Sequence, residues 1–287
     1  MRKISSLTIT EAVADLVKEA NYILPEDVIK AIEKSALEEE APVGREVLEQ
    51  ILLNNQVARR EKMAVCQDTG IVVVFVELGN EVYIEGDLYE AINTGVRKGY
   101  QEGYLRTSVV ESPLKRVNTG DNTPAVVHLQ LVPGDKLRLI VAPKGAGSEN
   151  MSLVKMLKPA DGKEGIRKLV LQTVKEAGAN PCPPIIVGIG LGGTFEKAAL
   201  LAKEALLRPL EDSNPDPEIA ELEKSLLADI NKLGIGPQGL GGRSTALAVK
   251  INTFPCHIAS LPVAININCH VARHKEIVIR SEEHTSE

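Results

Sequence analysis

The chain has 287 residues, of which 44% are hydrophobic and 25% charged, proportions typical of a folded protein with one large or two smaller domains. Its net charge of −6 argues against nucleic-acid binding, which usually requires a basic surface. No run approaches the roughly 18 apolar residues of a membrane helix, and the first residues lack the apolar core of a secretory signal. We therefore expect a cytoplasmic protein that binds neither nucleic acid nor membranes.

The first 63 residues are predicted to form a helical N-terminal layer. Thr10 precedes an apolar rhythm and suits a helix N-cap. A second helix is predicted from Leu24-Pro25, with a proline at an early position and acidic residues in the first turn, and a third from about Val43.

Residues 64–280 are predicted to form a mixed α/β body. Apolar β-branched runs predict strands, and amphipathic runs predict helices between them. We expect strands at 71–76, 125–131, 136–142, 184–189, 246–251, 257–267 and 276–279, and helices at 88–103, 165–177, 198–207 and 217–232. Pro133-Gly134-Asp135 predicts a hairpin between the second and third strands. The expected fold is α/β (α+β), with a helical layer on a mixed-sheet body flanked by helices; residues 1–280 form one domain and 281–287 a polar tail.

Three glycine-rich runs suggest close approach of a ligand or of another backbone. The run 188–193 lies between a strand and a helix, but its spacing does not match G-x-G-x-x-G and no acidic residue ends a strand about 20 residues later. A tight turn whose helix N-terminus faces an anion is the favoured interpretation. The run 144–148 puts Lys144 beside bare amides, which suits contact with a carboxylate or a phosphate. Gly147 is a candidate substrate-binding residue. For the run 234–242, a flexible connector and a site-shaping loop both remain open.

The four cysteines are Cys66, Cys182, Cys256 and Cys269, and they form no C-x-x-C pair. Three of them lie at predicted strand edges, beside Gln67 and Asp68, among the prolines of 181–184, and before His270. Three thiolates from separate loops are the usual protein ligands of an iron–sulfur cluster that lacks one ligand. Zinc held by three cysteines is the alternative, and buried structural cysteines are the simplest interpretation.

Several long motifs, in order, resemble the class I (iron–sulfur) fumarate hydratase family. They are CQDTG at 66–70, YLRTSVVE at 104–111, NTGDNTPA at 118–125, NPCPP at 180–184, LGIGPQGLGG at 233–242 and PCHIASLPVAININCH at 255–270. The resemblance covers nearly the whole chain. It is closest to the alpha subunit of the two-subunit form, which shares its architecture with the L-tartrate dehydratase alpha subunit.

The resemblance implies a set of site residues. Cys66, Cys182 and Cys269 match the ligands of a [4Fe–4S] cluster whose fourth iron binds substrate, whereas Cys256 matches no ligand position. By the same matching, Gln67 contacts substrate, Arg106 binds its carboxylate, and Asp68 and His257 belong to the catalytic machinery. His270, next to Cys269, is a candidate to support the cluster by hydrogen bonding.

The implied reaction is the reversible hydration of fumarate to (S)-malate. In the family a separate beta domain completes the active site, so we expect an inactive isolated chain that requires a beta subunit in an α2β2 complex. The alternatives are an L-tartrate dehydratase alpha subunit, a preference for mesaconate, a non-catalytic zinc or iron–sulfur module, and a regulatory subunit that binds a dicarboxylate without turnover.

Overall fold

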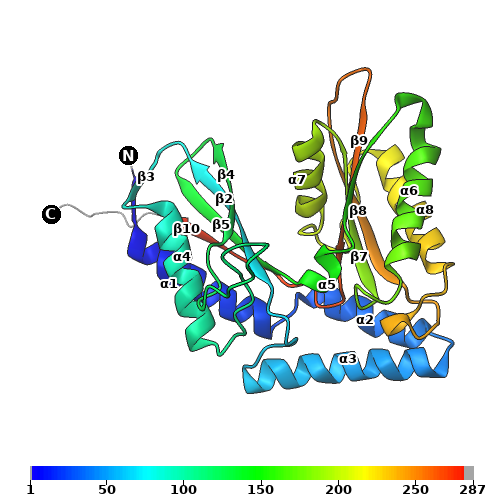
Figure 1. Cartoon of the computed structure of the whole chain (residues 1–287), viewed down its shortest axis with the longest axis horizontal. Coiled ribbons are helices and arrows are strands. Elements are labelled where there is room, and N and C mark those ends of the chain that lie inside the picture. The colour runs from blue at the N-terminus through cyan, green and yellow to red at the C-terminus, as the bar shows by residue number, and fades with distance from the viewer. Residues whose placement is uncertain (1, 281–287) are drawn as a thin grey trace. The chain divides into compact units, whose positions relative to one another are not determined.

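The computed structural model describes residues 2–280, so the predicted tail 281–287 lies outside the described residues (Figure 1). The chain forms two compact units. Within the described residues, the first unit comprises 2–24, 55–145 and 273–280, and the second comprises 25–54 and 146–272. Of the helices in residues 2–280, none combines the length and apolar character that a membrane span requires.

The first unit is a four-stranded sheet covered on one face by two helices. The elements are β1 (Arg2–Ser5), α1 (Ser6–Tyr22), β2 (Ile71–Gly79), β3 (Val82–Glu85), α4 (Leu88–Glu102), β4 (Val126–Val132), β5 (Lys136–Lys144) and β10 (Lys275–Arg280). The sheet has the order β10-β5-β2-β4, while β1 and β3 pair separately. Alternate residues of β2 and β5 pack against α1 and α4. Gly95 and Gly99 of α4 let the two helices approach closely. A Cβ on either glycine would lie only 2.7 or 2.8 Å, respectively, from a carbonyl oxygen of α1.

The second unit has helices on both faces of a buried sheet. Its elements are α2 (Glu26–Glu38), the first part of α3 (Pro42–Glu61), α5 (Ala146–Glu149), β6 (Leu153–Leu157), α6 (Gly162–Ala177), β7 (Ile185–Gly192), α7 (Phe195–Ala205), α8 (Pro217–Asn231), β8 (Ala246–Phe254) and β9 (Leu261–Asn268). Short 3-10 turns lie at Pro159–Asp161 and Pro237–Gly239. The order is β6-β9-β7-β8, with α6 and α8 on one face and α7 on the other (Figure 1).

Two glycines let α7 lie directly on β7. A Cβ on Gly188 would lie 2.2 Å from Ala202 O, and one on Gly190 would lie 2.0 Å from Ala198 O. No side chain fits there, since such distances are far inside van der Waals contact. Helix packing therefore accounts for these two glycines of the run 188–193.

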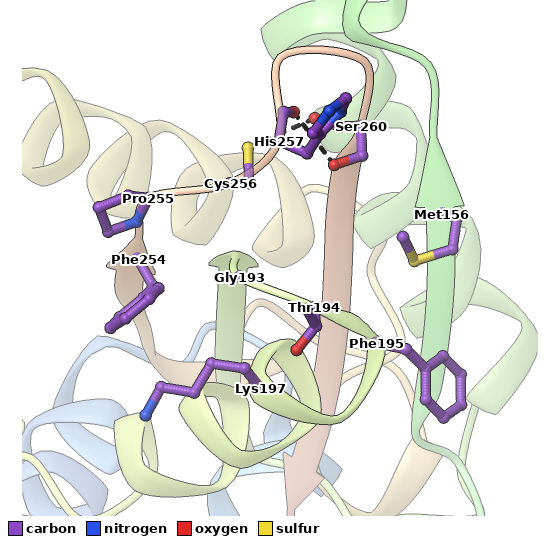
Figure 2. Close-up of a pocket in the computed structure, with 10 residues that line it drawn as sticks. All are labelled: Met156, Gly193, Thr194, Phe195, Lys197, Phe254, Pro255, Cys256, His257 and Ser260. Carbon is purple, nitrogen blue, oxygen red and sulfur yellow. Dashed lines mark hydrogen bonds between the residues drawn. The ribbon is translucent and has the colours of Figure 1, made fainter.

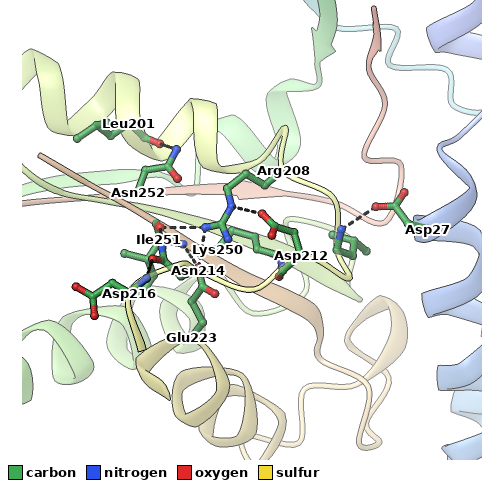
Figure 3. Close-up of polar contacts among 11 residues, drawn as sticks. Asp27, Leu201, Arg208, Asp212, Asn214, Asp216, Glu223, Lys250, Ile251 and Asn252 are labelled. Carbon is green, nitrogen blue, oxygen red and sulfur yellow. Dashed lines mark hydrogen bonds and ion pairs between the residues drawn. The ribbon is translucent and has the colours of Figure 1, made fainter. Parts of the chain in front are cut away.

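Buried charges hold the segment after α7 against β8 (Figure 3). Arg208 bridges Glu223 at 2.9 Å and Asp212 at 3.0 Å, and also donates to Ile251 O. The Lys250 ammonium donates to the Asp212 carbonyl, and burial lowers the pKa of Lys250 despite the acidic neighbours. Apart from Arg208 Nη2, a buried donor without a partner in residues 2–280, these charged groups pair with one another or with backbone carbonyls, and we assign the network to the stability of the fold.

The structure confirms a mixed α/β fold and corrects several local predictions. The predicted hairpin around Gly134 is wrong: β4 and β5 are not neighbours, because β2 lies between them, parallel to β4 and antiparallel to β5. The strand predicted at 257–267 begins only at Leu261, and residues 257–260 form a loop.

The N-terminal helix begins earlier than predicted. Its N-cap is Ser5, whose side chain accepts from Thr8 N, and a short strand precedes it. Thr10 is a buried residue within the helix, and its hydroxyl donates to Ala91 O at 3.0 Å. The threonine that suits a cap therefore ties α1 to α4 instead. The short strands β3 and β6 were not predicted.

Candidate active site

The first unit carries Cys66, Gln67 and Asp68 on the loop that leads into β2. Cys66 and Asp68 are half-buried, and Gln67 is exposed. The Asp68 carboxylate accepts a hydrogen bond from Gly70 N at 3.0 Å, and its carbonyl accepts one from the guanidinium of Arg273. A side chain on Gly145 would meet Asp68 Oδ2 at 3.1 Å, so the glycine keeps space open beside the carboxylate.

A second layer of hydrogen bonds fixes this loop. The Tyr100 hydroxyl donates to Thr69 O at 2.7 Å and Gly70 O at 3.0 Å, and Asn122 donates to Gly70 O at 3.1 Å. Burial raises the pKa of Tyr100 to about 12, so the phenol stays a neutral donor. The Thr69 hydroxyl donates to Arg106 O at 2.6 Å, which places the exposed Arg106 next to the loop that carries Asp68.

Sequence reasoning missed Arg273. It is 5% exposed, donates to the carbonyls of Asp68 and Pro143, and its Nη1 is a buried donor without a partner in residues 2–280. Arg273 follows Cys269 and His270 closely in the sequence, but no local pattern predicts its contact with Asp68. A buried guanidinium beside Asp68 increases the positive potential at the loop.

The second unit brings Cys182 and Cys269 to the same end of its sheet. Cys182 precedes β7 and Cys269 follows β9, and these strands are antiparallel neighbours with Ile186 opposite Asn268. Cys182 is exposed and has a left-handed backbone with φ of 53°, whereas Cys269 is half-buried. A non-glycine residue in this conformation costs about 1–2 kcal/mol, and such strain is concentrated at functional sites.

His270 and Gln238 lie between the cysteine-bearing loops. His270 Nδ1 is 2.9 Å from Cys182 O, and Gln238 Nε2 is 3.2 Å from the same nitrogen. Burial lowers the pKa of His270, against the hydrogen bond to Cys182 O, which raises it. The glycine run that contains Gln238 is thus a shaped part of this edge rather than a flexible connector.

Gly147 also lies at this edge of the second unit. It is exposed on the short helix α5, and a Cβ there would lie 3.4 Å from Asn180 O, so α5 packs against the loop that carries Cys182. The Glu149 carboxylate accepts from Lys203 and from Asn266, each at 2.7 Å, which anchors the end of α5. The amides near Gly147 are therefore held in place beside Cys182.

His257 lies at the opposite end of the same sheet. It belongs to the exposed loop between β8 and β9, whose Pro255 carbonyl accepts from Gly193 N just beyond β7. Between Ile185 and Gly192 the strand β7 advances seven residues, which is about 23 Å at about 3.3 Å per residue. Within one copy of the second unit, the structure therefore does not bring His257 together with Cys182 and Cys269.

The surroundings of His257 are apolar and open (Figure 2). A cavity of about 360 Å³ is lined by His257, Cys256, Lys197 and the exposed rings of Phe195 and Phe254. His257 Nδ1 accepts from Ala259 N at 3.1 Å, which fixes the ring within its loop. The Cys256 thiol contacts Ser260 O at 3.3 Å and lies with His257, away from the other cysteines of the unit.

The thiols fit the donor set of an iron–sulfur cluster. All four cysteines lie in the described residues and none forms a disulfide. Cys66 belongs to the first unit, whereas Cys182 and Cys269 belong to the second. In neither unit, over residues 2–280, do three His, Cys, Asp or Glu side chains form a metal-binding group. Thiols on supported loops at strand edges, one of them strained and exposed, suit soft-metal ligation.

Comparison with known proteins gives one consistent result. The chain matches the family described as "Fumarate hydratase (Fumerase)" over residues 10–278. It is 45% identical over 274 residues to "Putative L(+)-tartrate dehydratase subunit alpha" of Methanocaldococcus jannaschii, which covers 93% of this chain and 96% of the relative. It is 32% identical over 278 residues to "L(+)-tartrate dehydratase subunit alpha" of Escherichia coli O157:H7, covering 96% of this chain and 91% of the relative. The chain therefore belongs to the fumarate hydratase (fumerase) family.

Proposed function

We propose that this chain is the alpha subunit of an iron–sulfur hydro-lyase that interconverts fumarate and (S)-malate. The observation that carries the proposal is the family match over residues 10–278, which includes the motifs around Cys66, Cys182 and Cys269. The supported loops at these cysteines are consistent with it. We propose further that the substrate is a small dicarboxylate and that activity requires a beta subunit.

Cys66, Cys182 and Cys269 would hold a [4Fe–4S] cluster, with Cys256 excluded because it matches no ligand position of the family. When bound, an iron without a protein ligand supplies a Lewis acid that eases departure of the substrate hydroxyl without redox change. Because the three ligands must be thiolates, we place the protein in the cytoplasm, where thiols remain reduced. The grouping of the three thiols rests on the family match, since they belong to two units.

The other site residues would bind the substrate and move its proton. In malate, a C–H bond next to a carboxylate and a C–O bond on the neighbouring carbon break, a C=C bond forms, and the proton and hydroxide leave as water. Arg106 offers a bidentate fork to a carboxylate, and Gln67 and the amides near Gly147 add hydrogen bonds. Asp68, held by Gly70 N and Arg273, would take part in the proton relay.

The position of His257 supports a complex with two copies of the chain. His257 cannot reach the Cys182 edge of its own sheet, because the length of β7 separates them. If His257 acts at the same site as Cys182, it must come from a second copy. We therefore propose an α2β2 assembly in which two alpha chains and two beta subunits complete the sites.

L-tartrate dehydration to oxaloacetate is the second candidate function. It is favoured by the relatives, which are named as L(+)-tartrate dehydratase alpha subunits, in one case as a putative one. L-tartrate differs from malate by one further hydroxyl, so the same arginine, carboxylate and thiols would serve both reactions. Discrimination then depends on whether the pocket hydrogen-bonds or excludes that hydroxyl.

Anaerobic co-expression with the beta subunit of the same organism tests the proposal. We expect the complex to hydrate fumarate and dehydrate (S)-malate, and the isolated chain to be inactive although it binds the cluster. Faster turnover of L-tartrate would select the second candidate. A cluster-loaded complex that binds dicarboxylates but turns over none of the three would contradict both candidate functions. Full activity of the isolated chain would contradict the requirement for a beta subunit.

A further inference from the structure

The two cysteine loops of the second unit are joined by a side chain rather than by the sheet. The β7–β9 pairing ends with Ile186 opposite Asn268, so no ladder bond reaches Cys182. Beyond that point, His270 Nδ1 lies 2.9 Å from Cys182 O. A carbonyl oxygen can only accept, so Nδ1 carries the proton and donates it. This contact links the residue after Cys269 directly to the backbone of Cys182.

Gln238 adds a third loop to the same place. Its backbone N–H and its side-chain amide both donate to Pro183 O, at 2.7 and 3.1 Å. Cys182 N donates to Ala179 O at 3.0 Å, but Pro183 and Pro184 have no N–H, so the rest of the loop is held through its carbonyl oxygens. His270 therefore binds the carbonyl oxygen of Cys182, and Gln238 binds that of the next residue, Pro183.

Both ends of this arrangement have strained backbones. Cys182 has φ of 53° and Gln238 has φ of 52°, in the left-handed region that glycine adopts without cost. Each costs about 1–2 kcal/mol in a non-glycine residue. Most positive-φ positions in residues 2–280 are glycines, whereas these two carry a thiol and an amide. The two strained residues lie on two of the loops that meet here.

We propose that His270 and Gln238 form a clasp that holds the Cys182 loop at a fixed position relative to Cys269. Both are positioning residues: they bind backbone carbonyls and leave the thiol of Cys182 pointing from a rigid loop. The assignment of that thiol as a cluster ligand rests on the proposed function. The clasp itself rests on the hydrogen bonds among the three loops.

Cluster retention tests the consequence for the metal. We expect His270→Ala to lose iron to a chelator about 10–100-fold faster than wild type, the usual effect of removing a hydrogen-bond partner of a metal ligand. His270→Asn places an amide N–H near the position of Nδ1 and should restore slow loss. Iron release is followed by absorbance and by the electron paramagnetic resonance signal of the oxidised cluster. His128→Ala, on β4 of the other unit, is the control and should not change the rate.

Hydrogen exchange of the cluster-free chain tests the clasp independently. Without the His270 donor, we expect the amides of 179–182 and 236–241 to exchange at least about tenfold faster, while those of β7 and β9 keep their wild-type rates. Gln238→Ala should give the same pattern. Unchanged exchange and unchanged iron loss in His270→Ala would overturn the proposal, as would an Asn variant as defective as the Ala variant. If wild type binds no cluster, the proposed function fails, and the exchange data still decide the clasp.

Discussion

At the scale of single residues, the candidate site depends on side chains that are held through their backbones. Asp68 is fixed by contacts to its carbonyl and to its own loop, which leaves Oδ2 beside the open space at Gly145. A carboxylate held in this way can exchange a proton with a substrate carbon without first reorienting.

Replacing Asp68 with asparagine tests its role in proton transfer. Asn keeps the shape and an acceptor for Gly70 N but cannot carry the proton, so we expect kcat of the complex to fall about 10²–10⁴-fold with unchanged iron content. Asp15→Asn, on an exposed part of α1, is the matched control and should leave kcat unchanged. Normal turnover of Asp68→Asn with an intact cluster would exclude Asp68 from the relay.

The candidate site residues come from the match of several motifs to a known family, because local patterns alone leave zinc or a structural role open for the cysteines. CQDTG and NPCPP each present a thiol at the start of a strand, and the structure has strands there. Arg273 and Gln238 could not be predicted. Arg273 acts on a residue 205 positions away, and Gln238 owes its place to a left-handed backbone that no local pattern encodes.

At the scale of elements, α7 packs on β7 so closely that no side chain fits between them. Gly190→Ala would put a methyl group 2.0 Å from Ala198 O, and neither backbone can move without disturbing the sheet. We expect a loss of about 3 kcal/mol in the free energy of unfolding, measured by urea titration. Gly234→Ala, where φ is +67° and no atom lies within 4 Å, should cost only about 1–2 kcal/mol of backbone strain. Equal losses in the two variants would show that helix packing does not require Gly190.

The hairpin around Gly134 shows why element pairing is harder to predict than element positions. The strands at 126–132 and 136–144 lie within two residues of the predicted ranges, because alternation and turn residues are local signals. Their partner is β2, whose paired residues lie 53 positions before β4 and 59 to 73 positions before β5. Pairing with β2 buries one face of the sheet against α1 and α4. Burial of this sheet face against the two helices decides which strands pair, and the short turn around Gly134 does not.

At the scale of the whole molecule, the chain carries its candidate residues in two units and on opposite ends of one sheet. If His257 serves the site of a second copy, variants at the two ends should complement each other. A purified mixed complex with Cys182→Ser in one alpha chain and His257→Ala in the other retains one intact site, so we expect about half of wild-type activity.

The matched control for this complementation is a mixed complex of Cys182→Ser and Cys269→Ser, which damages both sites and should be inactive. If a complex with His257→Ala in both alpha chains is inactive, activity of the first pair establishes that His257 acts across copies. Full activity of that uniform complex would place His257 outside the site of Cys182. Inactivity of the first pair, alongside an active wild-type complex purified in the same way, would contradict action across copies.

The central claim is that Cys66, Cys182 and Cys269, from two units, hold one cluster. The direct measurement is the iron and acid-labile sulfide content of anaerobically reconstituted wild type and the four single Cys→Ser variants. We predict about four irons and four sulfides per chain in wild type and in Cys256→Ser, and a large loss in each of the other three. Full clusters in any of those three variants, or loss in Cys256→Ser, would contradict the account.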